Sequence, residues 1–187
     1  MTSLSPGSAD ALLFDLGRVV LDIDFSKAIA CWAGHAGCKP ETIVARYVRD
    51  SEAYRLHEVG KISDADYFAS LRASLGIAIS DAQFLEGWNA IFAGEMPDIA
   101  ELLPRAARQM PLYAFSNTNR PHVDHFSKEY AGLLGHFREL YLSSSIGCAN
   151  RTLRLSTMSW PRWGCRPAAS CFSMTWPRTS KGHGRGD

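Results

Sequence analysis

The sequence contains no apolar run long enough to span a lipid bilayer, and its first ten residues carry neither lysine nor arginine. A secretory signal needs a positively charged start followed by an apolar stretch, so we expect neither a leader nor a membrane partner. The five cysteines show no regular spacing, which argues against a disulfide framework. We therefore expect a cytoplasmic protein.

Charge is divided unevenly along the chain. Residues 1–149 hold 13 lysines and arginines against 18 acids, a balance of −5, whereas residues 150–187 hold 7 basic residues and one acid, a balance of +6. The same tail holds three of the five tryptophans and two of the five cysteines. A basic arm for nucleic acid would explain the charge. Such arms rarely carry scattered tryptophan and cysteine, and the tail has neither helical nor strand periodicity, so we expect disorder and no nucleic-acid partner.

Short apolar runs alternate with amphipathic segments in the first 149 residues. Buried strands are predicted at residues 11–14, 112–115 and 139–142. Helices are predicted between the first two strands, with Ser63 and Ser80 as N-caps, at residues 25–32, 41–48, 63–75, 80–92 and 98–109.

This order of elements indicates an α/β fold with a Rossmann-like parallel sheet. A helical block of this length after the first strand is too long for a simple crossover between strands. We therefore predict a core formed by residues 11–21 and 96–149, with residues 22–95 inserted as a helical cap.

Polar residues follow two of the predicted strands directly. Asp15 and Gly17 come after the first, and Ser116 and Asn117 come at the end of the second. In an open parallel sheet, ligands bind at the carboxyl ends of the strands. The four residues are therefore candidates for one site.

Both segments resemble motifs of the haloacid-dehalogenase (HAD) superfamily. Residues 12–25 are similar to its first motif, closest to the branch that contains the bacterial α-D-glucose-1-phosphate phosphatase, and residues 112–119 are similar to the second. The resemblance extends over about residues 11–149. It implies a Mg²⁺-dependent phosphatase of small phosphorylated metabolites that acts through an aspartyl-phosphate.

The resemblance also assigns roles to individual residues. Asp15 is implied as the nucleophile and a Mg²⁺ ligand, the Gly17 carbonyl as a second ligand, and Ser116 and Asn117 as the groups that hold the phosphoryl oxygens. Most phosphatases of the superfamily carry a second aspartate at the position of Gly17, which serves as the general acid. The glucose-1-phosphate branch also has glycine there, so no general acid is assigned.

The cap would select the substrate. Tyr54, His57, Glu58 and Trp88 combine aromatic and polar groups of the kind found in sugar sites, and Arg18 could attract an anion. For each of the four cap residues, however, the sequence favours ordinary helix packing or a solvated face over a role in the pocket, and a lone surface arginine such as Arg18 usually binds no anion.

The resemblance ends abruptly near Ala149. Family members continue with a lysine and then with a strand that ends in two acids, and residues 150–187 contain neither feature. Read from the third base of the Ala149 codon, the tail can supply both in the expected order, and Met174–Thr175 then encodes a forced aspartate. We therefore interpret residues 150–187 as translated out of frame, and we expect a core truncated at its C-terminal strands and an inactive chain.

Two other functions remain open from the sequence. A 2-haloacid dehalogenase shares the fold, the aspartate nucleophile and the Ser-Asn motif, but it needs no Mg²⁺ and does not use the paired acids. A non-enzymatic protein with a basic, nucleic-acid-binding tail is the third interpretation, and the acidic shifted-frame tail counts against it.

Limited proteolysis tests the interpretation of the tail. Without periodicity to build a core, residues after about 150 should be cleaved first and leave a fragment close to residues 1–149, identified by mass spectrometry. A tail as resistant as the rest of the chain would contradict this.

Overall fold

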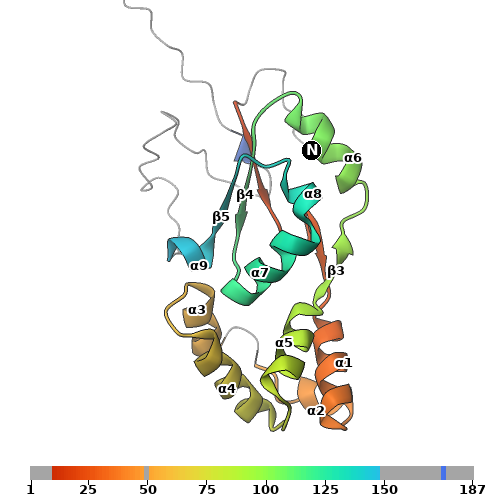
Figure 1. Cartoon of the computed structure of the whole chain (residues 1–187), viewed down its shortest axis with the longest axis vertical. Helices are drawn as coiled ribbons and strands as arrows, with labels where there is room; N and C mark the ends of the chain where they lie inside the picture. Colours follow the sequence, from red (N-terminus) through yellow and green to blue (C-terminus); the bar gives the residue numbers. More distant parts are fainter. Residues whose placement is uncertain (1–9, 49–50, 148–173, 176–187) are drawn as a thin grey trace, which may run out of the picture.

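The computed structural model describes residues 10–48, 51–147 and 174–175. Figure 1 shows a sheet with its covering helices in the upper part of the view and a group of helices below it. The main sheet has the strand order β5-β4-β1-β6, and β2 and β3 form a separate two-stranded sheet. None of the described helices is both long and apolar enough to cross a membrane.

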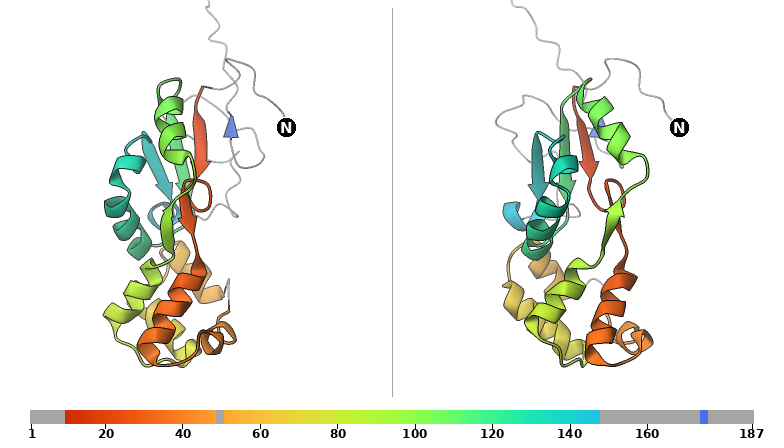
Figure 2. Two further views of the ribbon diagram at one scale, coloured as in Figure 1. Left: turned by 90° about the vertical axis from the view of Figure 1, so that its right-hand side faces the viewer. Right: turned by 45° about the vertical axis from the view of Figure 1, so that its right-hand side comes forward.

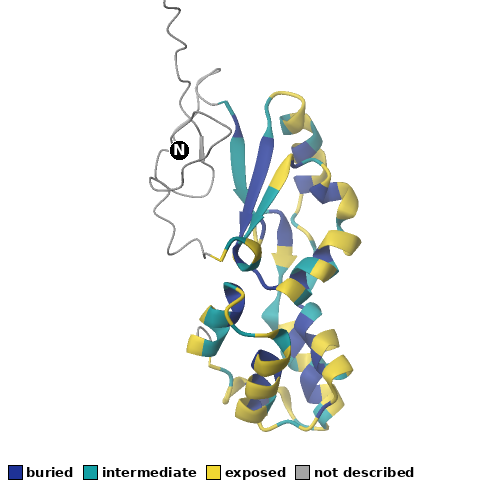
Figure 3. Cartoon of the chain, turned by 60° about the vertical axis from the view of Figure 1, so that its left-hand side comes forward, coloured by how far each residue is buried: buried dark blue, intermediate teal, exposed yellow. Residues whose placement is uncertain are grey.

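Parallel pairing organises the main sheet. β1 (Leu12–Asp15) runs parallel to β4 (Leu112–Ser116), which runs parallel to β5 (Glu139–Leu142). Every residue of β4 is buried, as expected for the central strand of a parallel sheet (Figure 3). These strands and the helices between them confirm the predicted α/β class with a Rossmann-like parallel sheet.

A short strand occupies the other side of β1. β6 (Met174–Thr175) pairs antiparallel with Leu12 and Leu13. The sequence predicted no strand in the tail, because two residues are too few to give a periodicity, and the open edge of β1 can pair with any short extended segment. The rest of the tail lies outside the described residues, so its predicted disorder stays a prediction.

Helices pack against the main sheet. α7 and α8 lie over one face of it, as both views of Figure 2 show. Two helical side chains, Leu103 and Phe126, pack with Leu16 and Leu112 of the sheet region in a buried hydrophobic cluster. The helices of this part of the chain are α6 (Ile99–Ala107), α7 (Arg120–Glu129), α8 (Ala131–Leu134) and α9 (Ser143–Ile146).

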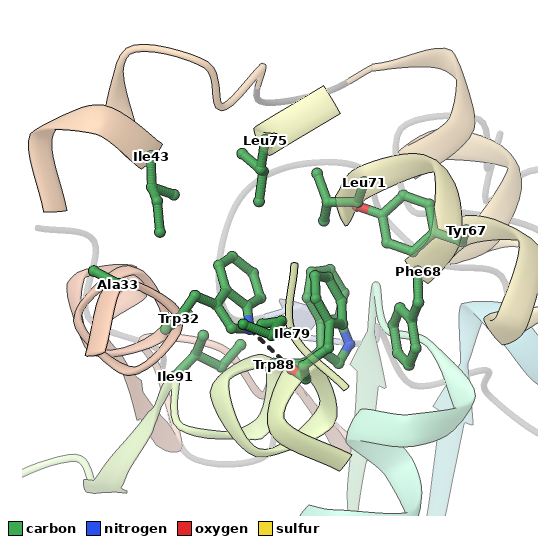
Figure 4. Close-up of a cluster of buried hydrophobic side chains, with 12 residues drawn as sticks. Trp32, Ala33, Ile43, Tyr67, Phe68, Leu71, Leu75, Ile79, Trp88 and Ile91 are labelled. Carbon is green, nitrogen blue, oxygen red and sulfur yellow. Dashed lines mark hydrogen bonds between the residues drawn. The ribbon is translucent and has the colours of Figure 1, made fainter. Parts of the chain in front are cut away.

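The lower group of helices has its own aromatic core. Trp32, Tyr67, Phe68, Phe84 and Trp88 stack or meet edge to face at its centre (Figure 4). The helices are α1 (Phe25–Ala36), α2 (Pro40–Val44), α3 (Glu52–Glu58), α4 (Asp64–Leu75) and α5 (Asp81–Asn89).

The predicted starts of two helices are confirmed. The Ser63 hydroxyl accepts from the Asp66 N–H, and Ser80 forms a reciprocal capping box with Gln83. The sequence did not predict α3.

A two-stranded ribbon connects the two groups of elements. β2 (Leu21–Ile23) pairs antiparallel with β3 (Phe92–Glu95), and Ile23 and Phe92 pack against both hydrophobic clusters. The sequence did not predict this ribbon, because neither strand is a continuous apolar run: β2 contains Asp22, and β3 contains Gly94. β3 also begins at Phe92, which the sequence placed wrongly at the end of a helix over residues 80–92, whereas α5 ends at Asn89. The proposed division into core and cap passes through the ribbon and stays a prediction.

Gly87 allows α1 and α5 to approach closely. A Cβ at this position would lie 2.3 Å from Trp32 Nε1, whereas a Cβ at Gly34 on α1 would meet nothing within 4 Å. Gly87→Ala should therefore lower the free energy of unfolding by about 1 to 3 kcal/mol through overpacking. Gly34→Ala, the matched control, should raise it by about 1 kcal/mol through helix propensity. Urea denaturation measures both, and equal effects of the two variants would contradict the close contact.

Candidate functional site

A cavity of about 240 Å³ opens at the carboxyl edge of the sheet, between the sheet and the helices below it. Asp15 at the end of β1 and Ser116 at the end of β4 both line it. The strand register explains why Asp15 and Ser116 lie at the same cavity. Asp15 pairs with Phe115, and Ser116 is the next residue along β4. The cavity is lined by Asp15, Leu16, Gly17, Arg18, Leu21, Ile23, Phe25, Tyr54, Ile91, Phe92, Ser116, Asn117, Thr118, His122 and Phe126.

Asp15 is partly buried at the end of its strand. Burial raises the pKa of its carboxyl group above the ordinary value, and hydrogen bonds from the backbone N–H groups of Leu16 and Gly17 oppose this only in part. Asp15 is the only acidic residue that lines the cavity among the described residues.

A tight turn follows Asp15. The Leu16 carbonyl accepts hydrogen bonds from the N–H groups of Val20 and Leu21, at 2.9 and 2.8 Å. Arg18 donates its N–H to the Leu21 carbonyl at 2.7 Å and has a φ of 60°, in the left-handed region. A non-glycine residue is strained there by about 1 kcal/mol or more. The hydrogen bonds of the turn hold Arg18 in this conformation. Gly17 and Arg18 are both exposed and line the cavity.

A buried hydroxyl fixes the loop after Ser116. Ser143 Oγ accepts from the Thr118 N–H at 2.8 Å and lies 2.9 Å from the Thr118 carbonyl oxygen. The same hydroxyl lies 2.7 Å from the carbonyl oxygen of Glu58 at the end of α3. Ser143 is fully buried at the start of α9, so it ties α3 to the loop that carries Asn117.

A second tie involves Asn119, His122 and Trp88. Asn119 Oδ1 caps α7 by accepting from the His122 N–H, and it also accepts from Trp88 Nε1, both at 3.1 Å. Asn119 Nδ2 donates to His122 Nδ1 at 3.0 Å, which leaves His122 Nε2 to donate to the Trp88 carbonyl at 2.9 Å. The two rings stack at 4.9 Å between centroids. Every polar atom of the His122 ring therefore has a partner.

The structure brings six of the predicted site residues to this cavity. They come from the turn after β1, from α3 and from the end of β4, and they are Asp15, Gly17, Arg18, Tyr54, Ser116 and Asn117.

His57 and Trp88 do not line the cavity. Both are buried among the aromatic residues of the helical group, and His57 Nε2 lies 2.7 Å from Asp64 Oδ1. Burial lowers the pKa of His57 despite this carboxylate. Their aromatic character predicts burial correctly, but helical spacing does not tell which buried surface a side chain joins. Glu58 is also absent from the lining and contributes its backbone carbonyl to Ser143.

Several residues that line the cavity were not predicted from the sequence. Phe25, Ile91 and Phe92 add apolar side chains to the lining of the cavity, and His122 lines it from α7. A signal for His122 was present, because Asn119 is a strong N-cap and Pro121 favours a helix start. Those two residues place His122 in the first turn of α7, where it lines the same cavity as Ser116.

Three bacterial proteins of known structure have similar folds. A HAD family enzyme from Bacteroides thetaiotaomicron, solved with magnesium and inorganic phosphate, matches with a TM-score of 0.64 and 23% identity, over 77% of this chain and 73% of that one. A protein from Porphyromonas gingivalis, predicted to be a HAD-like family hydrolase, matches with a TM-score of 0.60 and 18% identity, over 76% and 70%.

An L-2-haloacid dehalogenase from Xanthobacter autotrophicus, solved with chloropropionic acid covalently bound, has a TM-score of 0.52 and 14% identity, over 77% of this chain and 60% of that one. No family model matches the chain. The chain thus has the fold of HAD-family hydrolases, as its two motifs predicted.

The pH dependence of stability tests the buried state of His122. Burial lowers the pKa of His122 from 6.5 to about 3. As the pH falls, His122 is therefore protonated in the unfolded chain before it is protonated in the folded one. The stability contributed by neutral His122 should therefore be complete above pH 6.5 and be lost toward pH 3, at about 1.4 kcal/mol per pH unit. Denaturant unfolding between pH 4 and 7 measures the slope, and His122→Gln, which cannot titrate, should be less steep. An unchanged slope in this variant would contradict the assignment.

Proposed function

We propose that the protein is a Mg²⁺-dependent phosphatase of small phosphate esters in which Asp15 is the nucleophile. The observation that supports this most directly is the meeting of the Asp15 carboxylate and Ser116 in one cavity, at the carboxyl ends of adjacent parallel strands. Attack of a carboxylate on phosphorus replaces one difficult displacement by two easier ones, through an aspartyl-phosphate.

Each group at the strand ends has a task that suits its position. Ser116, at the end of the buried central strand, and the Asn117 amide hold the transferring phosphoryl oxygens. The Ser143 tie fixes the loop on which they stand, which matters because phosphoryl transfer depends mainly on positioning and charge neutralisation. His122 acts as a support for this loop, since both of its ring nitrogens are engaged.

The donor set at the turn after β1 fits Mg²⁺. This ion prefers oxygen ligands and usually takes only one or two carboxylates from a protein, with waters and substrate phosphate completing its coordination. The Asp15 carboxylate and the Gly17 carbonyl would hold it. When bound, Mg²⁺ neutralises charge that develops on the phosphoryl group. The magnesium and phosphate in the Bacteroides thetaiotaomicron structure support this choice.

The cavity favours a small substrate whose leaving group departs easily. Its volume is about 240 Å³, and its lining combines many apolar side chains with polar groups that include Tyr54 and Arg18. Apart from Asp15, no acid lines it among the described residues, and buried His122 stays neutral. An anomeric hydroxyl leaves more readily than an ordinary alcohol, because the ring oxygen stabilises its alkoxide. A sugar 1-phosphate is therefore our preferred substrate class.

The chain as written should be catalytically silent. Residues 150–187 contain neither the lysine pattern nor the paired acids that the family resemblance requires. Loss of such electrostatic groups costs about 10² to 10³ in rate for each one. Assays of aryl phosphate hydrolysis with Mg²⁺ should show no turnover, and measurable Mg²⁺-dependent hydrolysis would overturn the out-of-frame interpretation.

The frame-restored protein, made by adding one base at the Ala149 codon, should hydrolyse small phosphate esters and stop when the metal is chelated. Asp15→Asn should abolish turnover, because an amide is a poor nucleophile. Ser116→Ala should reduce it less, since the Asn117 amide remains. Asp22→Asn is the matched control, because Asp22 is exposed on β2 and does not line the cavity, and it should leave turnover near normal.

Two results would redirect the proposal. Substantial activity in Asp15→Asn would refute the nucleophile assignment. Consumption of 2-chloropropionate without metal would replace the phosphatase by a 2-haloacid dehalogenase, the reaction class of the Xanthobacter autotrophicus neighbour.

A further inference from the structure

Three metal-binding side chains of different types converge away from the cavity. Cys31 and His35 lie one turn apart on α1, and Glu86 faces them from α5. Their ligand atoms all lie within 4.8 Å of one another, and His35 Nε2 is 3.0 Å from Glu86 Oε2. None of the three lines the catalytic cavity.

The backbone beneath these side chains is held firmly. Trp32, next to Cys31, donates its indole N–H to the Phe84 carbonyl at 2.9 Å (Figure 4). Gly87, next to Glu86, lies so close to the Trp32 ring that no Cβ would fit. The crossing of α1 and α5 therefore fixes the Cα positions of Cys31, His35 and Glu86, and only the rotamers of these side chains can adjust.

Exposure leaves room for an additional ligand. The His35 side chain is 28% exposed and the Glu86 side chain is 64% exposed, whereas Cys31 is half-buried. Because His35 and Glu86 both reach the surface, water has access to their ligand atoms. An exposed histidine–carboxylate pair by itself contributes only about 0 to 1 kcal/mol. The thiol beside the pair gives the cluster the donor set of a transition-metal site.

We propose that Cys31, His35 and Glu86 form a Zn²⁺ site that links α1 to α5. Thiolate, imidazole and carboxylate together suit Zn²⁺, whereas the thiol is a poor ligand for Mg²⁺. Tetrahedral Zn²⁺ with these ligands separates sulfur from nitrogen by roughly 3.5 Å. Rotamer changes in exposed His35 and Glu86 can close the separations observed here to that value. Water takes the fourth position.

Binding would connect the two helices that carry part of the cavity wall. Phe25 begins α1, and Ile91 follows α5 by two residues. A metal that binds only the folded chain stabilises it by mass action, so Zn²⁺ should raise the melting temperature. The site is independent of the proposed phosphatase activity and survives if that proposal fails.

Co²⁺ titration of the full chain is the first test. Thiolate coordination gives a near-ultraviolet charge-transfer band, which should appear with the wild type and be displaced by Zn²⁺. Cys31→Ser should remove the band. His35→Ala and Glu86→Gln should weaken Zn²⁺ affinity by at least about tenfold, since even the loss of a ligand's hydrogen-bonding partner costs about 10- to 100-fold. Cys38→Ser, a cysteine of the same region outside the cluster, should change nothing.

A second measurement needs no variant and so does not depend on the folding of one. Zn²⁺ should slow alkylation of Cys31 by iodoacetamide and leave Cys38 at its metal-free rate, as followed by peptide mass spectrometry. Equal rates at Cys31 with and without Zn²⁺, or a Co²⁺ band that survives Cys31→Ser because cysteines beyond residue 147 carry it, would overturn the proposal.

Discussion

The pairing of β1 with β4 is the constraint on which the site depends. Parallel strands end at the same edge of a sheet, and the observed register places Asp15 beside Phe115, one residue before Ser116. A shift of this register by one residue would turn every side chain of β1 to the opposite face of the sheet. Because β4 is buried along its whole length and β1 contributes to the same core, the hydrophobic effect selects the register that brings the two polar ends together.

Contacts of a different kind hold the lower group of helices against the sheet region. Ser143 reaches the carbonyl of Glu58, and Asn119 and His122 reach Trp88, so buried hydrogen bonds join the sheet to the helices on two sides. Unsatisfied buried polar groups are costly, which makes these ties specific as well as stabilising. They also engage both ring nitrogens of His122, although this residue lines the cavity.

Sequence patterns predicted what depends on local order. The apolar runs gave β1, β4 and β5, and Ser63 and Ser80 gave two helix starts, because strand periodicity and capping act over a few neighbouring residues. The β2–β3 ribbon was missed because Asp22 and Gly94 interrupt the apolar pattern of its two strands. Trp88 and His57 were candidates for the cavity, with helix packing as the other interpretation, and burial in the aromatic cluster decides for packing. This outcome depends on how distant helices pack. The Cys31–His35–Glu86 cluster could not be predicted either, since only the crossing of α1 and α5 adds Glu86.

The central claim, that Asp15 attacks phosphorus, is tested most directly by trapping the intermediate. The frame-restored protein is quenched in acid during turnover of a phosphate ester and digested, and the peptide that contains Asp15 is examined by mass spectrometry. Our account predicts that this peptide gains a phosphoryl group on Asp15, and that Asp15→Asn shows none. Turnover with no phosphorylated peptide, or with the group on another residue, would contradict it.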